Sequence, residues 1–92
     1  MPRYLAESYL GRRADLAALV RRADAAARAL GVRHVRTSFM REDELCLQWF
    51  EAPSGAVVAD IGRRAGIDFD RIVEAVEITD RPEESWSNAV RR

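Results

Sequence analysis

Residues 14–32, ADLAALVRRADAAARALGV, contain the pattern that decides the fold class of this chain. Apolar side chains recur there at intervals of three and four residues and form one stripe, which predicts an amphipathic helix. The stripe consists of Leu16, Leu19, Val20, Ala23, Ala26, Ala27 and Leu30. Gly31 follows the stripe and suits the end of a helix, because glycine adopts the left-handed conformation at little cost. The sequence therefore predicts a helix that ends at Gly31.

A second helix end echoes the first. RALGV at residues 28–32 corresponds to RRAGI at residues 63–67. The second apolar stripe consists of Val58, Ile61 and Ala65. Ser54 precedes this stripe and is the expected N-cap, since its hydroxyl can accept from a free backbone N–H. The echo predicts two strand–helix–strand halves.

Four stretches have the β-branched, aromatic or alternating composition of strands. They are residues 3–9, 32–40, 44–51 and 71–79. The order β-α-β-β-α-β predicts a ferredoxin-like α+β sandwich over residues 1–80, with a four-stranded antiparallel sheet of order 4-1-3-2 and both helices on one face. Residues 81–92 are expected to form a polar C-terminal tail that carries Trp86.

Length and charge disfavour several function classes. The 92 residues suffice for one domain, and 15 basic residues, all arginine, balance 15 acidic ones. Nucleic-acid binders normally carry a basic surplus, so we expect no nucleic-acid partner. No apolar run reaches about 18 residues, and the first residues lack the apolar core of a signal peptide. The expected location is therefore the cytoplasm, without a membrane partner.

One face of the predicted sheet has no helix to cover it. The hairpin over residues 32–51 contributes several large apolar side chains to the sheet. They are Phe39, Leu45, Leu47, Trp49 and Phe50. An uncovered apolar face of this size usually marks an interface. We therefore expect a homodimer that forms through this face.

Polar side chains on the second strand mark the candidate site. Strand residues alternate between faces, so His34, Arg36 and Ser38 are predicted to share the open face. The guanidinium of Arg36 favours a carboxylate or an anionic ligand, because its N–H groups pair bidentately with such groups. Glu7 on the first strand and Glu74 on the last are candidate partners. An internal salt bridge without a ligand is the alternative interpretation.

The register of the hairpin determines what surrounds Arg36. A turn of two or four residues places Arg36 on the same face as Leu47 and Trp49. A turn of three residues places it beside Cys46 and Gln48 instead. The sequence leaves both registers open.

His34 and Cys46 are the single histidine and the single cysteine of the chain. One cysteine makes no internal disulfide, and no spaced Cys/His set for a zinc site is present. A lone strand histidine is usually structural, and a cysteine between Leu45 and Leu47 is usually buried and inert.

Several short motifs occur in a distinctive order. They are MPRYLAE at 1–7, GV at 31–32, FEAPS at 50–54, RAGI at 64–67 and DRIVE at 70–74. In this order they resemble the domain of unknown function 4242 family of small bacterial proteins, over roughly residues 1–80. The resemblance implies ferredoxin-like domains that pair into a dimeric α/β barrel. A nickel-binding, nickel-responsive protein is among the family's members.

The second strand departs from the family pattern, which reads Gly-Val-Thr-Trp-Val-His-Ser-Tyr. His34 stands at its Trp position, Arg36 at its His position and Ser38 at its Tyr position. Gln48 stands at the family's Cys position, and Cys46 lies two residues earlier. The resemblance therefore implies the fold but not, residue by residue, the nickel site.

The favoured hypothesis is a small binding protein whose dimer encloses a small polar or anionic ligand. The residues expected at the ligand are Glu7, His34, Arg36, Ser38 and Glu74. One alternative is a protein that binds nickel or another transition metal, with His34 and Cys46 as displaced ligands. Another is an enzyme of the dimeric-barrel type, an isomerase or a cofactor-free oxygenase, with His34 or Glu74 as general base.

Overall fold

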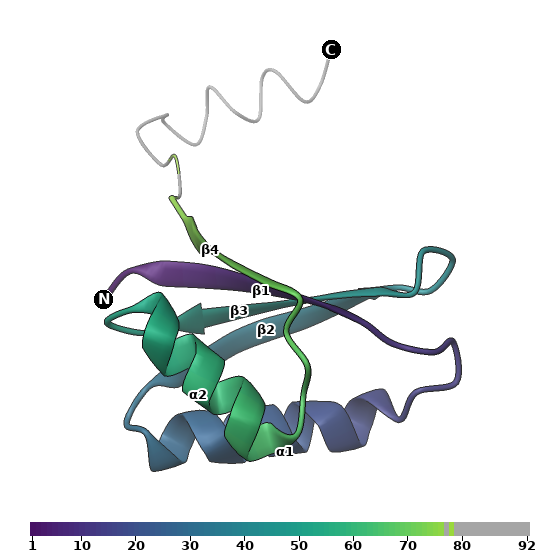
Figure 1. Ribbon diagram of the computed structural model, residues 1–92, viewed down its shortest axis with the longest axis horizontal. Coiled ribbons are helices and arrows are strands. Elements are labelled where there is room, and N and C mark those ends of the chain that lie inside the picture. Colours follow the sequence, from purple (N-terminus) through teal and green to yellow (C-terminus); the bar gives the residue numbers. More distant parts are fainter. Residues whose placement is uncertain (77, 79–92) are drawn as a thin grey trace, which may run out of the picture.

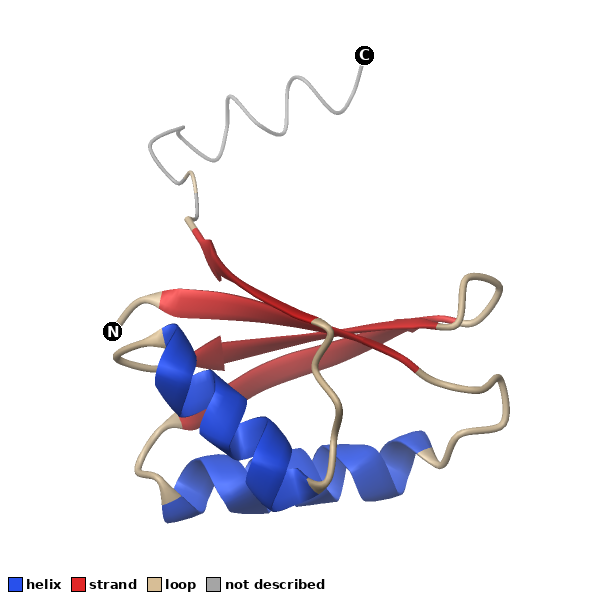
Figure 2. Cartoon of the chain, viewed as in Figure 1, coloured by secondary structure: helices blue, strands red, loops and turns tan. Residues whose placement is uncertain are grey.

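The sheet and the helices follow the order that the two strand–helix–strand halves predict. The structure, a computed structural model, describes residues 1–76 and 78. Its elements are β1 (Arg3–Tyr9), α1 (Leu16–Ala29), β2 (Arg33–Met40), β3 (Leu45–Glu51), α2 (Gly55–Ala65) and β4 (Arg71–Ala75). Both helices lie against the same side of the sheet, as Figure 1 and Figure 2 show. This is the α+β arrangement of a ferredoxin-like fold.

All neighbouring strands are antiparallel, in the order β2-β3-β1-β4. Read from the opposite edge, this is 4-1-3-2. β3 and β1 are therefore central, whereas β2 and β4 are edge strands. The hairpin turn, Arg41–Glu44, has four residues, and Met40 pairs with Leu45 across it.

The helix ends use the capping residues that their sequences provide. Ser54 Oγ accepts from Val57 N at 3.4 Å, as predicted, and Asp15 Oδ1 accepts from Ala18 N at 3.0 Å. Gly31 and Gly66 both have positive φ, 71° and 70°. The left-handed backbone at these two glycines turns the chain out of each helix toward the next strand.

β4 is shorter than residues 71–79. It ends at Ala75, whose partner Arg3 is the first residue of β1, so β1 offers no further residue to extend the ladder. Val76 and Ile78 beyond it are 79% and 85% exposed. Thr79, the 1–80 domain boundary and the predicted 81–92 tail lie outside the described residues.

The core fills the space between the sheet and the two helices. Its largest fully buried apolar side chains are Phe50 of β3 and Ile61 and Val58 of α2. Small side chains of α1 and β1, among them Ala23 and Ala6, let the helices approach the sheet closely. This side of the molecule buries its apolar surface without a partner chain.

A β-bulge in β2 changes which residues face the core. His34 pairs with Phe50, but Arg36 pairs with Trp49, so Val35 is the extra residue. His34 consequently faces the helices, and the prediction that it shares a face with Arg36 is wrong. Downstream of the bulge, Arg36 and Ser38 face the open side as predicted.

The open face of the sheet is covered by neither helix (Figure 1). The cross-strand pairs define its four rows, each running from β2 toward β4. The rows are Arg33–Glu51–Arg3–Ala75, Arg36–Trp49–Leu5–Val73, Ser38–Leu47–Glu7–Arg71 and Met40–Leu45–Tyr9. Apolar side chains therefore occupy its centre, with charged groups around them.

Candidate functional site

Arg36 and Trp49 form the centre of the candidate site on the open face. The four-residue turn settles the hairpin register, so Arg36 lies directly opposite Trp49. The guanidinium carbon lies 4.5 Å from the centroid of the Trp49 ring, within the range of a cation–π contact. Such stacking uses the face of the guanidinium and leaves its N–H edge available for an anion.

No ion pair joins Arg36 to a carboxylate in the part of the chain that the structure describes. The internal salt bridge that the sequence left as an alternative is therefore not formed within the described protomer. Ser38 follows Arg36 on the same face and is partly buried beside Leu47. Arg36 and Ser38 offer N–H and hydroxyl donors along one edge strand.

Glu7 lies on the open face but contacts a different arginine. Its Oε2 lies 3.7 Å from Nη1 of Arg71 on β4. β3 lies between β1 and β2, so two strand spacings, about 10 Å, separate Glu7 from β2. Glu7 therefore does not reach Arg36 within one protomer. Glu7 and Arg36 therefore lie at opposite sides of the apolar centre.

Glu74 lies elsewhere. It pairs with Tyr4 and shares the helix-facing side with Ile72, where it is exposed at the edge of the sheet. The prediction that Glu74 lies near Arg36 as a candidate partner is wrong, because the two residues lie on opposite sides of the sheet. The alternation of β4 places Arg71, Val73 and Ala75 on the open face instead.

Arginines are frequent on the open face. Its described strand residues include Arg3, Arg33, Arg36 and Arg71 and two carboxylates. Glu51 contacts Arg3 at 3.1 Å and Arg33 at 3.5 Å, and Glu7 contacts Arg71. Among the described strand residues of this face, arginines therefore outnumber carboxylates, in a chain whose formal net charge is zero.

His34 belongs to a separate hydrogen-bond network on the helix-facing side. Its side chain is 4% exposed, and its ring lies 5.0 Å from that of Phe50. Nδ1 lies 2.6 Å from Oδ1 of Asp24 on α1, and Nε2 lies 2.8 Å from Oγ1 of Thr37. Gln48 Nε2 donates to the same Thr37 oxygen at 3.0 Å. The network links α1 to β2 and β3.

The network is internally consistent for one tautomer of the imidazole. With the proton on Nδ1, His34 donates to Asp24, and Thr37 donates its hydroxyl proton to Nε2. Thr37 then accepts from Gln48, so each of these contacts has one donor and one acceptor. The sequence alone does not indicate this network, because only the bulge and the position of α1 bring Asp24, Thr37 and Gln48 together with His34.

This geometry bears on both alternatives that involve His34. Both ring nitrogens are already hydrogen-bonded, and Cys46 lies four β3 residues from the partner of His34, about 13 Å along the strand. One metal ion cannot bind both side chains at that separation. Among the described residues, no group of three or more His, Cys, Asp or Glu side chains could hold a metal ion.

A carboxylate, an imidazole and a hydroxyl in sequence are also the parts of a base-activated nucleophile. Here the imidazole is almost fully enclosed by α1 and Phe50, and Thr37 accepts from Gln48. The open, solvent-accessible base that an enzyme of the dimeric-barrel type requires is therefore not found at His34.

The fold has a counterpart among solved structures. No family model and no curated protein matches this chain. The chain is similar to the crystal structure of SCO4226 from Streptomyces coelicolor A3(2). The TM-score is 0.76 at 16% identity, and the match covers 84% of this chain and 99% of that one. At this identity the likeness shows the fold alone. No helix of the described residues is long and apolar enough to span a membrane.

Proposed function

We propose that this chain is a homodimeric binding protein in which two open sheet faces enclose a small anionic ligand at Arg36. The observation that carries the proposal is the stacked Arg36, which has no carboxylate partner among the described residues. Trp49 orients its guanidinium, and Ser38 supplies a neighbouring hydroxyl. Glu7 lines the far side of the same face.

The size of the open face is compatible with a dimer interface. Four strands, each about 4.8 Å wide and up to about seven residues in length along most of the sheet, give a face of at most about 23 by 19 Å. Two such faces in contact bury on the order of 900 Å² of accessible surface in total when they are treated as flat. This is close to the roughly 1,000 Å² that a specific interface requires. Tyr9, in the last row of this face, is 65% exposed and would be covered in such an interface.

Charge explains why the proposed ligand is an anion. Joining two open faces brings two Arg36 guanidiniums, neither paired with a carboxylate of the described residues, into a space partly screened from water, which is costly without counter-charge. A phosphate or carboxylate held between the two Arg36 side chains would supply that charge. The resemblance to the family of dimeric barrels also supports the pairing of the two faces.

Native mass spectrometry of the full chain tests the proposal, before and after dialysis against a chelator. We expect a dimer that carries a chelator-resistant organic or phosphate adduct. In Arg36→Gln the dimer should remain and the adduct should be lost. Arg33→Gln is the matched control, because Arg33 lies on the same face but contacts Glu51, and it should keep the adduct.

Three results would contradict the proposal. A monomer at tens of micromolar protein would remove the enclosed site. Equal loss of the adduct from the Arg33 and Arg36 variants would show general charge attraction rather than a site. A chelator-sensitive mass of a transition metal would favour the metal-binding alternative.

A further inference from the structure

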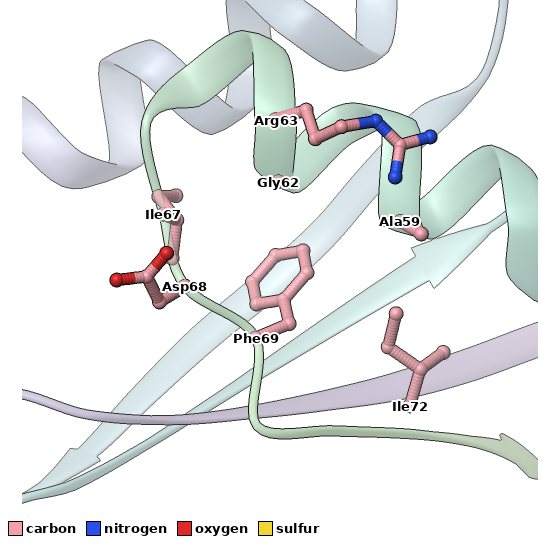
Figure 3. A pocket seen from close by; sticks show the side chains of 7 residues that line it. All are labelled: Ala59, Gly62, Arg63, Ile67, Asp68, Phe69 and Ile72. Carbon is pink, nitrogen blue, oxygen red and sulfur yellow. The ribbon is translucent and has the colours of Figure 1, made fainter.

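A cavity lies on the opposite side of the sheet from Arg36. It has a volume of about 230 Å³ and lies between α2, the loop over residues 66–70 and the first half of β4. Its lining residues are Ala59, Gly62, Arg63, Ile67, Asp68, Phe69 and Ile72. Figure 3 shows Phe69 and Ile72 facing Ala59 and Gly62 of the helix across this space.

The missing side chain at Gly62 fixes one wall of the cavity. A Cβ at this position would lie 2.8 Å from Cδ2 of Phe69 and 2.9 Å from the carbonyl oxygen of Ile67. The Phe69 ring therefore packs directly against the backbone of α2. The Phe69 ring also packs against the Phe50 ring of the core, and the two ring centroids lie 6.0 Å apart. The wall is thus anchored to the core rather than formed by a loose surface side chain.

The cavity has a mixed lining, in which apolar side chains lie beside the charged residues Arg63 and Asp68. Phe69, Ile72, Ile67 and Ala59 supply the apolar surface. Arg63 extends along α2 toward Ala59, whereas the Asp68 carboxylate points away from the cavity (Figure 3).

Arg63 keeps donors for a second partner. Its NH2 atom contacts Asp60, in a pair whose side chains are 70% and 48% exposed. An exposed pair of this kind contributes little stability, and a guanidinium has further N–H groups. Arg63 can therefore bind an anion at the mouth of the cavity.

From this arrangement we infer that the cavity binds one small carboxylic acid with an aromatic or branched apolar body. The apolar body lies between Phe69 and Ile72, and the carboxylate pairs with Arg63. The volume is sufficient, because an apolar cavity of about 150 Å³ already admits a benzene ring. This site is independent of the proposed dimer site, which lies across the sheet.

A titration of the full chain with phenylacetate, followed by ¹H–¹⁵N NMR, tests the inference. Saturable shifts are expected at the amides of Gly62, Phe69 and Ile72. Phenylacetamide has the same ring without the charge and should bind about tenfold more weakly, as should phenylacetate to Arg63→Gln. Arg64→Gln is the matched control, because Arg64 is an exposed neighbour that does not line the cavity.

A variant that fills the cavity separates binding there from binding elsewhere. Ala59→Leu should abolish the shifts at Gly62 and Phe69 while the rest of the spectrum remains that of the folded chain. Arg36→Gln should leave them unchanged, so the two sites can fail separately. Shifts centred on Trp49, equal weakening by the Arg63 and Arg64 variants, or no saturation at 10 mM phenylacetate would each overturn the inference.

Discussion

The two sides of the sheet satisfy their polar groups in opposite ways. On the helix-facing side, His34, Thr37 and Gln48 are buried or partly buried, and they hydrogen-bond to one another and to Asp24. On the open side, Arg36 has an aromatic ring beneath it but no carboxylate among the described residues. The four side chains of the His34 network contact one another within one protomer, although the Oε1 atom of Gln48 is buried without a hydrogen-bond partner among the described residues. Arg36 has unused binding capacity, so we assign the His34 network to stability and Arg36 to recognition.

Neighbouring residues of β3 provide the strongest test of that division. Phe50 is fully buried, whereas Trp49 lies on the open face. Phe50→Ala should cost about 3–5 kcal/mol of unfolding free energy, because the lost ring leaves a cavity beside His34 and Phe69. Trp49→Ala should cost less, and its cost should grow with protein concentration if Trp49 lies in a dimer interface.

Urea unfolding at two protein concentrations, about 1 and 100 µM, measures both effects. If Phe50→Ala does not fold, Phe50→Leu keeps the comparison available at a smaller cost. Equal costs for the two residues at the lower concentration would show that the open face is as tightly packed as the core. That result would contradict the division between the two sides.

Adjacent residues of β2 sharpen the comparison for polar groups. Thr37→Val keeps the shape of the side chain but removes the oxygen that contacts His34 Nε2 and Gln48 Nε2. Leaving these buried groups unpaired should cost about 1–3 kcal/mol. Ser38→Ala, on the open face, should change stability by less than about 0.5 kcal/mol. Thermal and urea unfolding of the two variants check the difference.

A loss of less than about 0.5 kcal/mol in Thr37→Val would mean that the network contributes no net stability. In that case the burial of His34 would not be explained by its hydrogen bonds. A large loss of unfolding free energy in Ser38→Ala would instead show that the open face contributes to the stability of the protomer.

The sequence predicts the architecture because its signals are local. Apolar spacing and the glycines after each stripe locate the helices, and the element order gives the topology. The register of the β2–β3 hairpin depends on how the two strands pair, which the residues of either strand alone do not determine. The turn length leaves two registers for Arg36 open, and the four-residue turn selects the one with Trp49.

The bulge at Val35 could not be predicted from the spacing of β2. The bulge places His34 on the helix-facing side of the sheet. There His34 contacts Asp24 and Thr37, which come within hydrogen-bond distance only in the folded chain. The face of Glu74 was missed for a related reason, because the pairing of β4 with β1 sets it. Long-range contacts therefore decided both corrections to the site.

The smallest expected effect concerns Cys46, on the helix-facing side. Burial raises the pKa of its thiol above the ordinary value of 9.0, more than the hydrogen bond with Ser8 lowers it. The unfolded thiol therefore ionises first, so the stability that this group contributes is full below about pH 9 and is lost as the pH rises through the folded pKa.

Between pH 8 and pH 10.5 the wild-type chain should lose more unfolding free energy than Cys46→Ala, which has no thiol to ionise. Urea unfolding of both chains at the two pH values gives this difference directly, since other titrating groups cancel between them. An equal or larger loss in Cys46→Ala would show that Cys46 reaches solvent as a thiolate, and this part of the helix-facing side would then be less closed than its packing indicates.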